Sequence, residues 1–186
     1  MEQKTLNQKT WHAAGTAGLI LGVVSSAYLF SGQLIAGDLT PATVWQQVLS
    51  LVLWAVKFSL CIWIMKFSMT KFAHENRDAD KKQIFKMGVA AALLSALVYS
   101  GIYLANMQYI SADYYNQIID TSVQEMSANL DSNSMASLNK LLPMLPQILF
   151  FSNFVYCFLF GTVLSAILSR KVVTQDPFNE FKSDEQ

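Results

Sequence analysis

The sequence predicts an all-α polytopic membrane protein, a four-transmembrane-helix bundle with an exoplasmic amphipathic helical segment between helices 3 and 4. Two observations predict this class. Of the 186 residues, 53% are hydrophobic and only 14% are charged, whereas soluble domains carry about 25% charged residues. The apolar residues also gather into four blocks of about 20 or more residues, the length at which a helix crosses roughly 30 Å of hydrocarbon.

The four blocks divide the chain into one membrane domain, residues 1–170, and a polar cytoplasmic tail, residues 171–186. We expect spans at about 11–36, 44–69, 84–110 and 147–169. The first block is longer than the roughly 7–15 apolar residues of a secretory signal, so we interpret it as a retained helix. Gly37 to Pro41 favours a tight turn in which Thr40 caps the second helix.

Residues 111–146 form the one long segment outside the blocks, and their pattern is helical. Apolar residues recur at spacings of three and four, with polar residues between them. The pattern predicts a helix over Tyr115 to Leu130, capped by Ser111 or Asp113. We expect this helix to lie along the membrane surface or to cap the bundle. In either case the side chains that face inward are Ile119, Val123 and Met126. A break over 129–134 and a shorter apolar stripe that ends at Pro143 follow.

Positive charge is distributed very unevenly between the two sides of the predicted bundle. One side holds Lys4, Lys9, Lys66, Lys71, Arg77, Lys81, Lys82, Lys86, Arg170, Lys171 and Lys182. The other side holds Lys140 alone. Because lysine and arginine resist translocation, this asymmetry predicts that both termini and the second loop are cytoplasmic.

Small residues recur every four positions in three of the four blocks. These stripes are Ala14, Gly18, Gly22 and Ser26 in the first block, Gly88, Ala92, Ala96 and Ser100 in the third, and Cys157, Gly161, Ser165 and Ser169 in the fourth. Small residues allow helices to pack closely in lipid, so the stripes predict a compact bundle. They leave open whether a stripe faces a helix of the same chain or a second copy.

Lys57 is the candidate functional residue inside the membrane, because it lies near the middle of the second block. A lysine at that depth costs roughly 2.5–3.5 kcal/mol to insert, and no block contains an Asp or Glu to pair with it. We expect its side chain to point into the bundle, near Trp54 and the tyrosines of the third and fourth spans. Three interpretations stay open: a functional lysine, a tolerated structural lysine, and a lysine that faces a partner subunit.

The remaining polar and reactive residues predict no catalytic, cofactor-binding or metal site. Cys61 and Cys157 lie inside apolar blocks and are typical of small buried residues. His12 and His74 are far apart and have no neighbours at ligand spacing. Asn106 and Asn153, near the outer ends of their spans, are expected to make interhelical hydrogen bonds. The net charge of zero gives no reason to expect nucleic-acid binding.

Several local patterns resemble a known family. The second block leads into Lys66-Phe67 and then a charged hairpin with Arg77-Asp78. The exoplasmic segment opens with Asp113-Tyr114-Tyr115, the fourth block ends at Arg170-Lys171, and the tail carries Asp176-Pro177-Phe178. In layout and in these patterns the chain resembles domain of unknown function 4199, a family of small four-span proteins. The resemblance implies a bacterial inner membrane and four helices, and it implies no activity and no site residues.

These features favour a non-enzymatic membrane protein, an accessory or scaffold subunit that binds a partner through its exoplasmic segment. The alternative is a small transporter or channel that works as an oligomer and uses Lys57 along its path. An intramembrane enzyme is disfavoured because no catalytic constellation is present. The expected partners are the lipid bilayer and either other membrane subunits or a second copy of the chain.

Overall fold

The computed structural model describes residues 2–36, 44–76, 79–127 and 131–172, and within these ranges every regular element is helical. The long helices are α1 (Glu2–Ala36), α2 (Val44–Glu75), α3 (Lys81–Ala105) and α6 (Leu145–Val172). The shorter elements are η1 (Asn106–Ile110), α4 (Ala112–Ser127), α5 (Ser132–Leu141) and η2 (Leu142–Met144). Four helical stretches are long and apolar enough to cross a membrane. The predicted all-α, four-span fold is confirmed.

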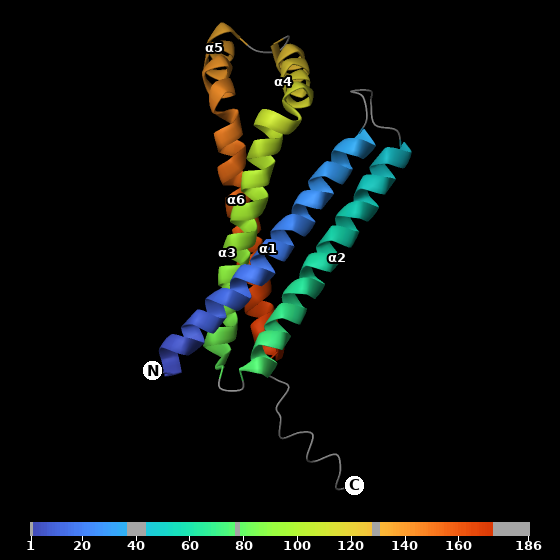
Figure 1. The fold of residues 1–186 in the computed structure, drawn as a ribbon. Helices are drawn as coiled ribbons and strands as arrows, with labels where there is room; N and C mark the ends of the chain where they lie inside the picture. Colours follow the sequence, from blue (N-terminus) through green and yellow to red (C-terminus); the bar gives the residue numbers. More distant parts are fainter. Residues whose placement is uncertain (1, 37–43, 77–78, 128–130, 173–186) are drawn as a thin grey trace.

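The four long helices form a bundle in which α3 is the central member (Figure 1). α1 crosses one side of α3, and α6 packs on another side. α2 lies mainly against α1. It approaches α6 at one end of the bundle and separates from it toward the other end (Figure 1). We call the first end, where α1 begins and α6 finishes, the terminal end, and the opposite one the hairpin end.

The buried core occupies the half of the bundle nearer the terminal end. Met69 from α2 and Met87 from α3 are almost completely buried there, and so is Ala14 from α1. Methionine side chains are flexible, so they fill irregular gaps between the packed helices. The helices also run past the apolar blocks. α3, for example, begins at Lys81 rather than 84, because Asp80 and Gln83 form a capping box.

The segment between α3 and α6 is a helical hairpin that projects beyond the bundle (Figure 1). α4 and α5 are the two predicted helices. No described side chain in either of them is buried. The segment extends beyond the bundle end instead of folding over it, and the alternative, that α4 lies along the membrane surface, stays a prediction. Of the three residues expected to turn inward, Ile119 and Val123 are half-buried, whereas Met126 is 45% exposed. The segment extends outward because α3 continues through η1 into α4, which carries α4 away from the bundle end.

Some predictions fall outside the described residues. These are the turn from Gly37 to Pro41 with its Thr40 cap, the Arg77-Asp78 pair, the start of the break at 129–130, and most of the tail from residue 173 on.

Candidate functional site

The predicted small-residue stripes lie at the closest helix contacts, and they face helices of the same chain. A methyl group placed on Gly18 of α1 would lie 2.7 Å from Leu94 Cβ and 2.9 Å from the Ala91 carbonyl oxygen of α3. One placed on Gly22 would lie 2.7 Å from Val98 Cβ. All three distances are shorter than a real Cβ atom tolerates, so the backbones of α1 and α3 approach closely at both glycines.

α6 packs against α3 through the other two stripes. A methyl group on Gly161 would lie 2.5 Å from Ala92 Cβ, and one on Gly88 would overlap the Ser165 side chain. Ser165 is completely buried and its hydroxyl donates a hydrogen bond to the Phe85 carbonyl oxygen at 3.2 Å. All six predicted packing residues therefore lie at helix contacts around α3.

Lys57 points into the bundle between two tyrosine rings. Its Nζ lies 4.7 Å from the centroid of the Tyr28 ring on α1 and 5.0 Å from the centroid of the Tyr99 ring on α3. Both distances fall within the roughly 6 Å reach of a cation–π interaction. Among the described residues, Lys57 has no ion pair and no hydrogen-bond acceptor.

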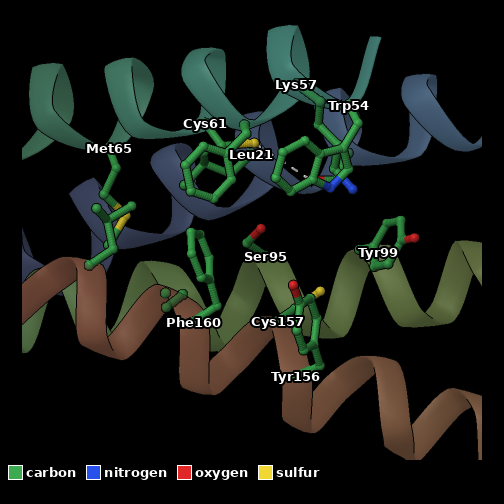
Figure 2. Close-up of a pocket in the computed structure, with 15 residues that line it drawn as sticks. Leu21, Trp54, Lys57, Cys61, Met65, Ser95, Tyr99, Tyr156, Cys157 and Phe160 are labelled. Atoms are coloured by element: carbon green, nitrogen blue, oxygen red, sulfur yellow. Dashed lines mark hydrogen bonds between the residues drawn. The ribbon is translucent and has the colours of Figure 1, made fainter. Parts of the chain in front are cut away.

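A cavity of about 120 Å³ surrounds the Lys57 side chain, where all four long helices meet. Figure 2 shows Trp54 and Lys57 on α2 facing Ser95 and Tyr99 on α3 and Tyr156 on α6. The remaining lining residues are mostly apolar: Leu21, Ser25, Phe58, Cys61, Met65, Ala92, Cys157, Phe160, Gly161 and Leu164. No described carboxylate lies on the cavity wall.

The two cysteines both line this cavity, which their sequence context alone did not predict. Cys61 is one helical turn from Lys57, and its Sγ lies 3.9 Å from Ser25 Oγ. Cys157 lies on the α6 side. Both thiols are free. Asn153, by contrast, does not make the expected interhelical bond, because its amide donates to the Leu149 carbonyl oxygen of its own helix.

A second polar cluster ties the hairpin to the bundle, and of its four members only Gln33 is absent from the sequence-based expectations. The Tyr115 hydroxyl of α4 accepts hydrogen bonds from Gln33 Nε2 at 3.1 Å and from Asn106 Nδ2 at 3.4 Å. Ser111 Oγ lies within hydrogen-bonding distance of the Gln33 and Asn106 side-chain oxygens. Asn106 is completely buried in the π-helical turn η1. The sequence signal for this cluster is that Gln33, Asn106 and Tyr115 are polar residues near the same ends of three neighbouring helical segments.

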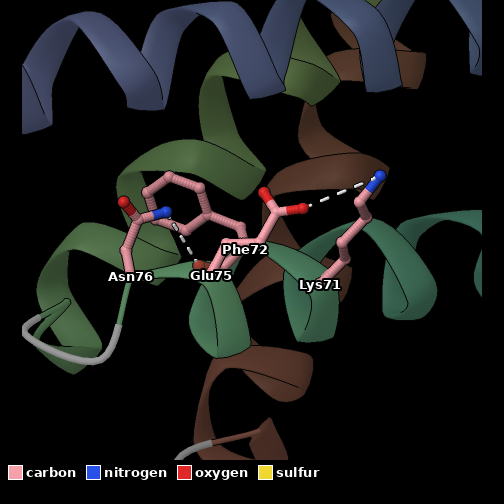
Figure 3. A network of polar contacts seen from close by, with 4 residues as sticks. All are labelled: Lys71, Phe72, Glu75 and Asn76. Carbon is pink, nitrogen blue, oxygen red and sulfur yellow. Dashed lines mark hydrogen bonds and ion pairs between the residues drawn. The ribbon is translucent and has the colours of Figure 1, made fainter.

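At the terminal end, a polar cavity of about 260 Å³ separates the start of α1 from the last turns of α2. It is lined by Lys9, His12, Ala13, Phe72, Glu75 and Asn76. Figure 3 shows the α2 part: Lys71 pairs with Glu75 at 3.8 Å, and the Asn76 amide donates to the Phe72 carbonyl oxygen. The ion pair is exposed and belongs to a class worth about 0.5 kcal/mol. Among the described residues of this cavity, no group of side chains is placed to hold a metal ion.

Comparison with known proteins gives a family and no function. No curated protein and no solved structure matches the chain. Among the described residues, no group of three or more His, Cys, Asp or Glu side chains is placed to hold a metal ion. The family described as Protein of unknown function (DUF4199) matches residues 16–170, which cover most of each of the four apolar helices. The chain therefore belongs to this family, as its local patterns had suggested.

Proposed function

We propose that this chain is a non-enzymatic accessory subunit of the bacterial inner membrane, and that it binds a partner membrane protein through the α4–α5 hairpin. The observation that carries the proposal is the uncovered hairpin itself. Two helices with amphipathic sequences project from the bundle, and none of their described side chains is completely buried: Ile119 and Val123 of α4 are half-buried, and Met126 is 45% exposed. An amphipathic helix is stabilised mainly by packing of its apolar face, so the part of that face that stays exposed offers a contact surface to a partner.

The charges on the hairpin indicate what kind of surface that is. α4 exposes Asp113, Asp120 and Glu125 and contains no lysine or arginine. The expected partner therefore combines an apolar stripe, which covers Ile119 and Met126, with basic side chains at its rim. The same acidity disfavours adsorption of α4 to anionic lipid, which attracts basic helices. The orientation proposed from the charge asymmetry places this contact on the exoplasmic side.

Site-specific photo-crosslinking in living cells tests the proposal. A photoreactive amino acid at Met126 should give one discrete adduct with another membrane protein. The double variant Asp120→Lys, Glu125→Lys should weaken that adduct strongly, because it reverses the charge that the partner recognises. The matched control places the photoreactive residue at Trp63, which is 62% exposed on α2 in the bundle and should not give the adduct.

Three results would overturn the proposal. An adduct of twice the chain mass would show self-association, and labelled lipid alone would show that the hairpin rests on the bilayer. An adduct that survives the charge reversal unchanged would show that the acidic face does not recognise the partner.

A further inference from the structure

The positive charge of Lys57 is not neutralised within the described part of the chain. The Tyr28 and Tyr99 rings stabilise the ammonium group through cation–π interactions. The rings provide no lone pairs, however, and an ammonium group carries three N–H donors. An acceptor that enters the cavity would meet a cation already held in place and largely removed from water.

Ser95 offers a second donor in the same cavity. Some hydroxyl groups along the long helices donate to the carbonyl oxygen one turn earlier, as those of Ser26 and Thr162 do. Ser95, on the cavity wall, has no hydrogen bond from its hydroxyl among the described residues. Its hydroxyl points across the cavity toward α2 in Figure 2. Lys57 and Ser95 thus present two donors to one space, which suits an oxyanion.

The cavity is also polarised along its length. Lys57 lies near the end lined by Trp54 and Tyr99, and the opposite end is lined by Met65 and Leu164. Residues 54 and 65 are about 16 Å apart along a helix. A volume of about 120 Å³ is well below the roughly 300–1,000 Å³ of sites for drug-sized ligands. The space therefore suits a head group and part of one slim chain.

The cavity can be entered sideways, from between α2 and α6. These two helices separate toward the hairpin end, and Phe58 and Phe160 bridge them with ring centroids 5.2 Å apart. Beside that bridge, Trp54 is 50% exposed and Tyr156 is 68% exposed, although both line the cavity. In a bilayer this flank faces hydrocarbon, so the ligand that reaches Lys57 is one dissolved in the membrane.

We propose that this cavity binds the carboxylate head of a single-chain amphiphile of the fatty-acid type, which enters between α2 and α6. The carboxylate accepts hydrogen bonds from Lys57 and Ser95, and the chain lies toward Met65 or out through the flank. This inference does not depend on the proposed role of the hairpin, because the two sites share no residue.

The test measures saturable photolabelling of the purified, reconstituted protein by a diazirine-bearing hexadecanoic acid. Lys57→Met should reduce the apparent affinity about tenfold or more, since a lost hydrogen bond to a charged group is worth roughly 1.5–3 kcal/mol. The matched control is Lys66→Met on the same helix, an exposed lysine that does not line the cavity. Ser95→Ala should give a smaller loss, and it keeps the experiment informative if Lys57→Met folds poorly.

Competition separates the chemical features of the ligand. Unlabelled hexadecanoate should displace the probe, whereas hexadecanol lacks the charge and butyrate lacks the chain, so both should compete at least tenfold more weakly by the same hydrogen-bond and burial arguments. Equal competition by hexadecanol would overturn the role of the charge. Equal competition by butyrate would show that the cavity binds a small carboxylate without recognising its chain, which would overturn the proposed amphiphile. Labelling that is unchanged in both Lys57→Met and Ser95→Ala would exclude this cavity as the binding place.

Discussion

Tyr115 is the residue that joins the hairpin to the bundle. Its hydroxyl accepts hydrogen bonds from Gln33 and Asn106, and its ring lies edge-on to Tyr103 with centroids 6.1 Å apart. Tyr115→Phe keeps the ring and removes the acceptor, which leaves the buried Asn106 amide with fewer partners. We expect a loss of about 1–3 kcal/mol in unfolding free energy, measured as a lower melting temperature in mild detergent.

The adjacent tyrosine provides the control for that change. Tyr114 contacts the Tyr115 ring, and no hydrogen bond of its hydroxyl occurs among the described residues. Tyr114→Phe should therefore leave the melting temperature within error of the parent protein. If both variants behave alike, the polar cluster does not hold the hairpin in place.

Asp131 gives the hairpin a pH-dependent helix cap. The hydroxyl and the backbone N–H of Ser134 donate to its carboxylate, which lowers the pKa of Asp131 below the ordinary value of an aspartate. A carboxyl whose pKa is lowered by folding stabilises α5 at and above its ordinary pKa, and this contribution disappears as the pH falls through the lowered pKa. Solution NMR in detergent should show the Ser134 amide resonance shifting over that acidic range.

Asp131→Asn is the matched variant for this titration. Asparagine caps a helix about as well as aspartate and carries no titrating group. In Asp131→Asn the Ser134 amide resonance should stay constant over the acidic range. A shift that persists in this variant would mean that another group causes it.

The orientation of the Lys57 side chain could be predicted from the sequence, whereas the residues around it could not. A lone lysine in an apolar block has few low-cost positions, so an orientation into the bundle followed from insertion cost alone. Its two ring partners lie 29 residues before it and 42 residues after it, on other helices. Which rings come within reach depends on how the helices rotate about their axes, and apolar blocks with weak amphipathicity do not encode that rotation clearly.

At the scale of elements, the small-residue stripes predicted more of the packing than the apolar blocks did. α1, α3 and α6 carry stripes and pack together, whereas α2, which lacks one, lies at the side of the bundle. Two glycines of α1 allow a matched test of this rule. A methyl group on Gly18 would strike α3, whereas one on Gly15 would meet nothing within 4 Å.

Gly18→Ala should therefore lower the unfolding free energy by about 1–3 kcal/mol, the usual cost of overpacking. Gly15→Ala should be neutral or slightly stabilising, because alanine favours a helix by up to about 1 kcal/mol over glycine. Thermal unfolding in detergent compares the two. Equal effects would show that α1 and α3 can separate without cost, and that the close contact does not hold the bundle.

The position of the hairpin could not be predicted from its own pattern. Periodicity located α4 and α5 to within a few residues, but it specifies only which face of a helix is apolar. It does not specify what covers that face. The direction of α4 is set by η1, a π-helical turn that begins at the buried Asn106 and keeps the chain helical through Ile110. Ser111 then uses its hydroxyl for the polar cluster instead of capping α4.

The whole molecule has two unlike ends, and this difference predicts its orientation. The terminal end contains the first turns of α1, the last turns of α2, the first turns of α3 and the end of α6. The described residues of these regions include nine of the chain's 13 lysines and arginines. Among the described residues of the hairpin end, Lys140 is the one lysine or arginine. Since positive charge is retained on the cytoplasmic side, the terminal end should face the cytoplasm and the hairpin should face the exoplasmic side.

Reporter fusions test this orientation directly. A reporter that is active only in the cytoplasm should be active when it is fused after Lys182, and it should be silent when it is inserted at Asn133, an exposed position in α5. An exported reporter at the same two positions should give the reverse pattern and serves as the control for expression. Cytoplasmic activity at Asn133 would place the hairpin inside the cell. In that case the contact proposed for Met126 would have to be sought among cytoplasmic partners, while the Lys57 cavity would keep its lateral entrance from the bilayer in either orientation.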